Sequence, residues 1–218
     1  MLKTARIWFR KVGAAKYISH LDLNRCMARA MRRASIPAWV TEGYNPHLFL
    51  TFALPLSLGQ EGLDESMDIR VPDDFAIDTL PERLNAVLPP ILTATRAAEA
   101  VEKPAAIAAA EYQVRISGES GLPGIADALA AFVTQDEIPV TKKSKAGDRT
   151  VNLRPYLNEC TIEPTDGGAC LRLILPAGSS ENINPALLTD AFAASYPEPL
   201  RISIVRTAIY DGARKKFA

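Results

Sequence analysis

The chain has 218 residues, 48% of them apolar and 23% charged, which allows one large domain or two of about 100 residues and excludes a disordered chain. Basic and acidic residues balance at 25 each, and no apolar run approaches the ~20 residues that span a bilayer. The N-terminus has no signal-peptide pattern, so we expect a cytoplasmic protein with no membrane contact.

The cysteine spacing argues against a disulfide or metal site, and the charge distribution allows an anionic partner. Cys26, Cys160 and Cys170 follow no disulfide or metal-binding spacing, and we expect no metal and no cofactor in this chain; Cys26 is expected to be a small buried side chain. Residues 1–50 carry nine Lys or Arg against two acidic residues, whereas residues 51–110 carry four against ten. This segregation allows a polyanionic partner despite the neutral total.

Residues 1–100 are expected to form one domain. Period-two alternation predicts strands over 6–12 and 65–71, the apolar run LFLTFALPL predicts a buried strand over 48–56, and a short strand follows at 91–96. A helix starts at about His20, and a second helix covers 77–88. The order strand, helix, strand, strand, helix, strand is that of a ferredoxin-like domain.

The same order is expected again over 111–218, after a linker at 101–110. Predicted strands cover 112–117, 138–142, 156–163, 170–175 and 200–210, and predicted helices cover 125–133 and 185–195. The predicted fold class is therefore α+β, with two tandem ferredoxin-like (βαββαβ) halves whose antiparallel sheets carry helices on one face, plus one extra strand in the second half.

The first helix is the most informative element. Ser19 followed by Asp22 is a capping-box variant, and Leu23, Met27, Ala30, Met31 and Ala34 form one apolar stripe. Arg25, Arg29, Arg32 and Arg33 span an arc of roughly 100° on the other side. They have no acidic residue four positions away, so we expect an anion-binding face, against the alternative of a merely solvated one.

Other candidate residues flank this helix. His20 is either a neutral donor beside a bound anion or a structural residue, and His47 is either functional or a side chain that fixes the Gly43–His47 turn. Tyr17, Tyr44 and Asn45 lie in the same segment, where the tyrosines either stack a base or pack in the core.

Charged residues elsewhere give weaker signals. Lys142, Lys143 and Lys145 form a basic loop in the second half, and Arg214 to Lys216 are expected to be a frayed, solvated tail. Asp64, Glu65 and Asp68 are expected at a sheet edge, where they either form ion pairs with the helix arginines or contact a partner.

The run Tyr17-Ile18-Ser19-His20-Leu21-Asp22-Leu23, the four arginines and Glu42-Gly43-Tyr44-Asn45-Pro46-His47 resemble the radical-SAM-associated protein family of bacteria. Further matches include Leu54-Pro55-Leu56, Met67-Asp68 and Thr141-Lys142-Lys143, but Leu48-Phe49 stand where members usually have Pro and a basic residue. The resemblance implies an accessory protein found beside, or fused to, a B12-binding-type radical SAM protein. That partner would carry the iron–sulfur cluster and S-adenosylmethionine.

Three functions follow as hypotheses. The first is a non-catalytic module that binds RNA or another anionic substrate for the partner enzyme, through Tyr17, Ser19, His20, Arg25, Arg29, Arg32, Arg33, Tyr44, Asn45, His47, Lys142, Lys143 and Lys145. The second is a metal-independent endoribonuclease with His20 or His47 as the catalytic residue. A distant, fold-level similarity to CRISPR repeat-associated RNA-binding proteins accompanies it. The third is a purely structural subunit that binds protein.

Overall fold

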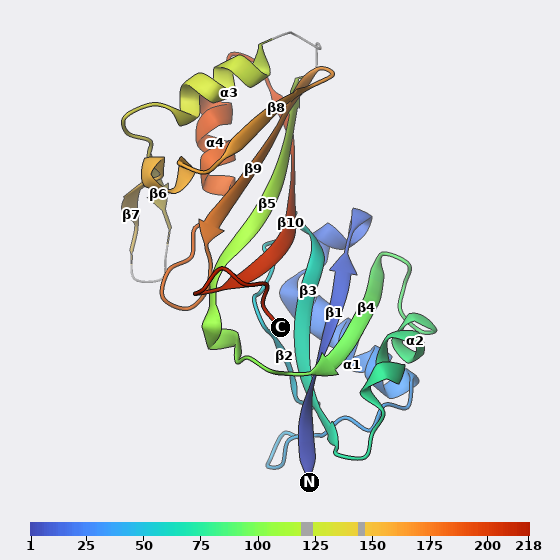
Figure 1. The fold of residues 1–218 in the computed structure, drawn as a ribbon. Coiled ribbons are helices and arrows are strands. Elements are labelled where there is room, and N and C mark those ends of the chain that lie inside the picture. The colour runs from blue at the N-terminus through green and yellow to red at the C-terminus, as the bar shows by residue number, and fades with distance from the viewer. Residues whose placement is uncertain (119–123, 144–146) are drawn as a thin grey trace. The chain divides into compact units, whose positions relative to one another are not determined.

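The computed structural model describes residues 1–118, 124–143 and 147–218 (Figure 1). It is a mixed α+β fold with four α-helices and ten β-strands in these ranges. The chain forms two compact units, one of Met1–Ile107 with Lys215–Ala218 and one of Ala108–Arg214, and each is described by itself. None of the described helices is both long and apolar enough to cross a bilayer.

The first unit has the element order predicted from the sequence. Its elements are β1 (Leu2–Lys11), α1 (His20–Arg33), β2 (Leu50–Phe52), β3 (Glu61–Pro72), α2 (Leu80–Asn85) and β4 (Leu92–Glu99), with 3-10 turns at Gly13–Tyr17 and Ile77–Thr79. The strands lie in the order β4-β1-β3-β2, and every neighbouring pair is antiparallel.

Both helices of this unit pack on one face of the sheet. Ile7 and Phe9 of β1 alternate with residues on the other face, and they join Met27 and Met31 of α1 and Leu84 of α2 in one buried cluster. Leu23, Met27, Ala30 and Met31 are buried, so the apolar stripe predicted for the first helix is confirmed at these four positions. The arginine side of α1 is consequently turned away from the sheet.

The other face of β1 and β3 carries a buried ion pair. The Arg6 guanidinium is fully buried and donates from Nε and Nη2 to the two carboxylate oxygens of Asp68, at 2.7 and 2.8 Å. It also donates to the main-chain oxygens of Ala218 and Glu102, each at 2.7 Å, and lies 4.1 Å from the centre of the Phe217 ring. These contacts attach residues 215–218 to the first unit.

This arrangement corrects two expectations. The segment that follows Arg214 is not a frayed, solvated tail, because Phe217 is 3% exposed and packs on Arg6. Glu65 and Asp68 do not lie at a sheet edge, because β3 is flanked by β1 and β2 and both side chains are buried. No local pattern indicates the partner of Asp68, because Arg6 lies 62 residues away in the chain.

The prediction of a buried strand over 48–56 is also wrong, both in the length of the strand and in its burial. Only β2, three residues long, pairs with β3, and its burial is partial. Leu48 instead forms an isolated bridge with Val40, which closes the loop that carries the Asn-Pro-His turn. The apolar run supplies Leu48, Ala53 and Leu54 as separate buried contacts, and a run of this kind cannot be told from a buried strand by periodicity alone.

The second unit contains β5 (Ile107–Gly118), α3 (Ile125–Val133), β6 (Pro139–Lys142), β7 (Arg149–Asn152), β8 (Thr161–Thr165), β9 (Gly168–Pro176), α4 (Ala186–Ser195) and β10 (Leu200–Asp211). Its main sheet has the order β10-β5-β9-β8, and β6 and β7 pair as a separate hairpin. β5 starts inside the range expected to be a linker.

Two details of the second unit differ from the sequence prediction. The chain over Arg154–Leu157 is a 3-10 turn, so the strand expected from 156 starts only at Thr161; Pro155 sets the backbone angle for this turn. The short strand β7 was not predicted, because its four residues are mostly polar and exposed.

Candidate anion-binding site

Helix α1 starts where the sequence predicts. Ser19 is the N-cap, and its Oγ accepts a hydrogen bond from the Asp22 main-chain N–H at 3.1 Å. The same hydroxyl donates to Asp22 Oδ2 at 2.7 Å, so the cap and the first turn are tied together. The cap fixes the residue at which α1 begins, and the buried stripe of Leu23, Met27, Ala30 and Met31 leaves the arginines on the opposite side of the helix.

Replacing Ser19 by alanine is expected to lower the free energy of unfolding by about 1 kcal/mol, because the Asp22 amide loses its acceptor. Urea unfolding followed by tryptophan fluorescence measures this directly, since both tryptophans, Trp8 and Trp39, lie in the first unit. Ser19→Gly is the matched control and should cost only a few tenths of a kcal/mol. Equal losses for the two variants would contradict the capping role.

The four arginines of α1 are all exposed, as the amphipathic pattern predicts. Arg25 forms an ion pair with Asp22 at 3.1 Å. The sequence argument missed this partner, because it considered only acidic residues four positions away and Asp22 lies three positions away. In the part of the chain that the structure describes, Arg29, Arg32 and Arg33 have no hydrogen bond and no ion pair. Three neighbouring guanidinium groups are thus left without a counter-charge from this chain.

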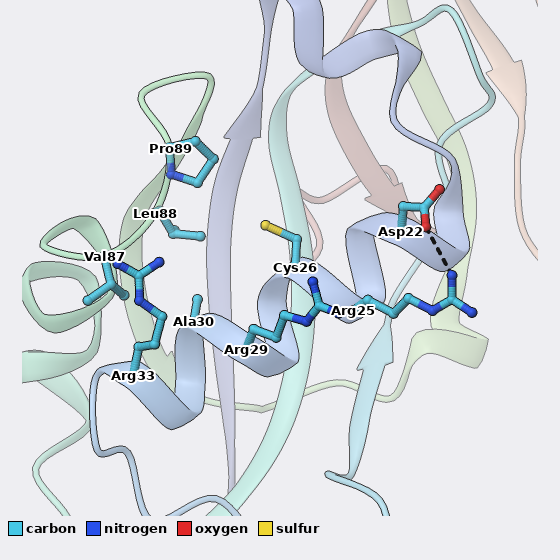
Figure 2. Close-up of a pocket in the computed structure, with 9 residues that line it drawn as sticks. All are labelled: Asp22, Arg25, Cys26, Arg29, Ala30, Arg33, Val87, Leu88 and Pro89. Carbon is cyan, nitrogen blue, oxygen red and sulfur yellow. Dashed lines mark hydrogen bonds and ion pairs between the residues drawn. The ribbon is translucent and has the colours of Figure 1, made fainter.

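Arg25, Arg29 and Arg33 line a pocket of about 390 Å³ on the surface of the first unit, together with Asp22, Cys26, Ala30, Val87, Leu88 and Pro89. Figure 2 shows the three side chains leaving successive turns of α1, with the segment after α2 beside them. Their spacing of four residues corresponds to a rise of about 6 Å per step. Arg32 is exposed but does not line this pocket.

One wall of the pocket is apolar, and the sequence did not reveal it. The sequence predicts a second helix that includes Val87 and Leu88 and stops at Pro89, but α2 ends at Asn85, and these three residues lie beside α1. Cys26 is half-buried at the pocket, which corrects its expected full burial. The site therefore combines cationic side chains with a hydrophobic surface, a combination suited to an anion with an apolar or aromatic portion.

Asp22 is the acidic side chain of the pocket. The hydrogen bond from the Ser19 hydroxyl, followed by that from Arg25, lowers the pKa of Asp22 from its ordinary value of 3.8. The carboxylate stays ionised at neutral pH and neutralises Arg25 only. It also places a negative charge in the first turn of α1, where the helix dipole favours one.

This lowered pKa predicts a small pH dependence of stability. A carboxyl group with a lower pKa in the folded state stabilises the protein above its unfolded-state pKa, and the contribution disappears as the pH falls through the folded-state pKa. The difference in unfolding free energy between the native protein and Asp22→Asn should therefore be constant well above pH 3.8 and shrink as the pH falls below it, through the lowered folded-state pKa. A difference that stays constant as the pH is lowered below 3.8 would contradict the assignment.

The two histidines have different surroundings. The exposed His20 ring lies edge-on to Phe52, with ring centres 5.1 Å apart. His47 Nδ1 lies 3.1 Å from the Thr41 hydroxyl and 3.1 Å from the Asn45 main-chain oxygen. These contacts agree with the interpretation that His47 fixes its loop. The catalytic hypothesis stays a prediction, tested by replacing each histidine and assaying RNA cleavage.

The aromatic and basic candidates are only partly brought together. Tyr17 and Tyr44 are exposed, at 70% and 107%, so neither packs in the core. Asn45 is exposed in the Gly43–His47 turn. Lys142 and Lys143 belong to the second unit, and Lys145 lies outside the described residues.

Among residues 1–118, 124–143 and 147–218, no group of three or more His, Cys, Asp or Glu side chains could hold a metal ion.

Comparisons with known proteins give a family but no activity. No curated protein matches the sequence. Among solved structures, the acetolactate synthase small subunit from Thermotoga maritima is 11% identical, with 94% of this chain and 96% of that chain covered and a TM-score of 0.27. An unknown protein from Galdieria sulphuraria is 12% identical, with 94% and 99% covered and a TM-score of 0.28. These scores carry no argument about function.

A family model matches residues 4–185, which include the Ser19 cap, all four α1 arginines, the Asn-Pro-His turn and both described lysines of the basic loop. The match extends over most of both units. The chain belongs to the family described as "Uncharacterized protein conserved in bacteria (DUF2344)".

Proposed function

We propose that this protein is a non-catalytic accessory module that binds RNA or another anionic substrate on the arginine side of α1 and presents it to a partner enzyme. The observation that carries the proposal is the exposure of Arg29, Arg32 and Arg33 without a partner among the described residues. Like charges on one helix face repel each other, and a bound polyanion removes this cost.

The shape of the site supports an RNA strand. Three arginines at intervals of about 6 Å can contact successive phosphates of an extended strand. The apolar wall and the exposed ring of Tyr17 offer surfaces for bases, as in other proteins that bind single strands. Lys142 and Lys143 would add contacts from the second unit.

The proposed partner is a radical SAM protein, because of the resemblance carried by the Ser-His-Leu-Asp and Asn-Pro-His motifs, and the proposed compartment is the cytoplasm.

The strand orders β4-β1-β3-β2 and β10-β5-β9-β8 support a further part of the proposal, that the two units are tandem ferredoxin-like halves. The hairpin of β6 and β7 would then be the insertion that distinguishes the second half.

Fluorescence anisotropy with a short labelled single-stranded RNA tests RNA binding, using the purified full chain. Saturable binding that is weakened by Arg29→Gln supports the proposal. The absence of binding, or binding unchanged by every α1 substitution, would overturn it for RNA.

A pull-down from bacterial lysate with and without RNase tests the partner. Recovery of a radical SAM protein is expected, and its absence under both conditions would contradict this part of the proposal.

A further inference from the structure

A second pocket, of about 690 Å³, lies wholly within the second unit. It is lined by Lys142 of β6, Arg149 of β7 and the loop that joins β9 to α4, residues 178–183. The loop is closed by a hydrogen bond from the Ile183 main-chain N–H to the Pro176 main-chain oxygen at 2.9 Å. The Ile183 side chain is 2% exposed and anchors the loop to the core of the unit.

The two cations of this pocket face each other across the hairpin. Lys142 and Arg149 are directly opposite in the antiparallel register of β6 and β7. Residues in such positions have Cβ atoms about 5 Å apart, and like charges there destabilise the pair. A hairpin that places two positive charges opposite each other is stabilised when an anion lies between them.

The contacts of these side chains leave donors available. Lys142 Nζ donates to the Asn182 main-chain oxygen at 2.6 Å, which fixes the ammonium group at the pocket and leaves two of its three protons. Arg149 is exposed and has no hydrogen bond or ion pair within the described ranges. Its five N–H donors can therefore engage a ligand in bidentate geometry.

The carboxylate of this pocket does not neutralise Arg149. Glu181 accepts a hydrogen bond from the Tyr156 hydroxyl at 2.6 Å, and this hydrogen bond is the main cause that raises the pKa of Tyr156. The pocket thus keeps one positive charge in excess. Ser179 and Ser180 add hydroxyl donors from the loop.

We propose that this pocket is a phosphate-binding site, in which Lys142 and Arg149 hold the phosphate group of a phosphomonoester or phosphodiester and the two serine hydroxyls donate to its remaining oxygens. The inference deepens the proposed function on the side of the basic loop, because an RNA phosphodiester is one source of such a group. It does not depend on the arginines of α1.

The test is a titration of the full chain with inorganic phosphate at constant ionic strength, followed by amide chemical shifts. Shifts are expected at Gly178, Ser179, Ser180 and Asn182. Arg149→Gln should weaken binding about tenfold, since it removes charge-assisted hydrogen bonds. Arg115→Gln, another exposed arginine of the same unit, is the matched control and should bind phosphate normally.

Two results would overturn the site: equal affinity of the Arg149 and Arg115 variants, or shifts confined to other regions. The Arg149 side chain has no hydrogen bond or ion pair within the described ranges, so the variant should fold, and an otherwise unchanged spectrum shows that a loss of binding is local. A double Ser179→Ala, Ser180→Ala variant gives a second reading and should also bind more weakly.

A short single-stranded RNA then distinguishes the sources of the phosphate group. If RNA displaces inorganic phosphate from these amides, the pocket takes a phosphodiester; if it does not, the pocket takes a small phosphorylated molecule, and the phosphate site stands in either case. A variant whose α1 arginines are replaced separates the two proposals. If this variant binds phosphate and its RNA binding is unchanged, the proposed function fails and the phosphate site stands.

Discussion

Asp68→Asn is expected to lower the free energy of unfolding by about 3–5 kcal/mol, because it leaves the Arg6 guanidinium buried without its counter-charge. The Arg6 side chain is 0% exposed and Asp68 9%, so water cannot replace the lost carboxylate. The Glu102 main-chain oxygen, which also accepts from Arg6, satisfies a donor but carries no full charge. Urea unfolding followed by the fluorescence of Trp8 and Trp39 measures the loss.

Asp64→Asn is the matched control for this prediction. Asp64 lies on the same strand and pairs with Arg96 at 2.8 Å, but this pair is partly exposed, at 24% and 48%. Exposed pairs contribute about 0–1 kcal/mol, so the control should unfold almost as the native protein does. If the Asp68 variant loses no more stability than the Asp64 variant, the ion pair does not hold β1, β3 and residues 215–218 together as described.

The second large effect concerns binding. Replacing Arg25, Arg29, Arg32 and Arg33 together by glutamine should weaken the binding of single-stranded RNA about 100-fold or more at low salt, because charge-assisted contacts with phosphates are lost. Glutamine is a good helix former, and the replaced side chains are exposed, so α1 should stay folded. Fluorescence anisotropy gives the affinity and circular dichroism verifies the fold.

The control removes the same charge elsewhere. Four exposed cations outside α1 and both pockets, Arg10, Lys103, Arg115 and Lys216, are replaced by glutamine in one variant. Its affinity should fall far less than that of the α1 variant, since total charge contributes only long-range attraction. Equal losses would mean that net charge, and not the arginine face, governs binding.

Local signals in the sequence were sufficient to predict those helices that are defined by a cap or by an amphipathic pattern. The Ser19–Asp22 cap gave the start of α1, and the stripe from Leu23 to Met31 gave its buried side. The range predicted for α3 agrees with Ile125–Val133. These features depend on residues within a few positions of one another, so they can be recognised from the sequence alone.

The features that were missed depend on distant residues. The Arg6–Asp68 pair joins positions 62 apart, and the apolar wall of the arginine pocket comes from the segment after α2. The opposition of Lys142 and Arg149 requires the register of a hairpin whose second strand has no hydrophobic pattern. Sequence periodicity reports which side of an element is buried, but not which side chains meet across the fold.

The most direct test of the central claim is the salt dependence of RNA affinity, measured by anisotropy for the native protein and for the variant with four glutamines in α1. Three phosphate contacts to a single strand, from Arg29, Arg32 and Arg33, predict that the logarithm of the association constant falls by about 2 for each tenfold increase in salt, and that the variant loses most of this slope. An affinity of the native protein that does not change with salt, or an equal slope in both proteins, would contradict an arginine face that binds a polyanion.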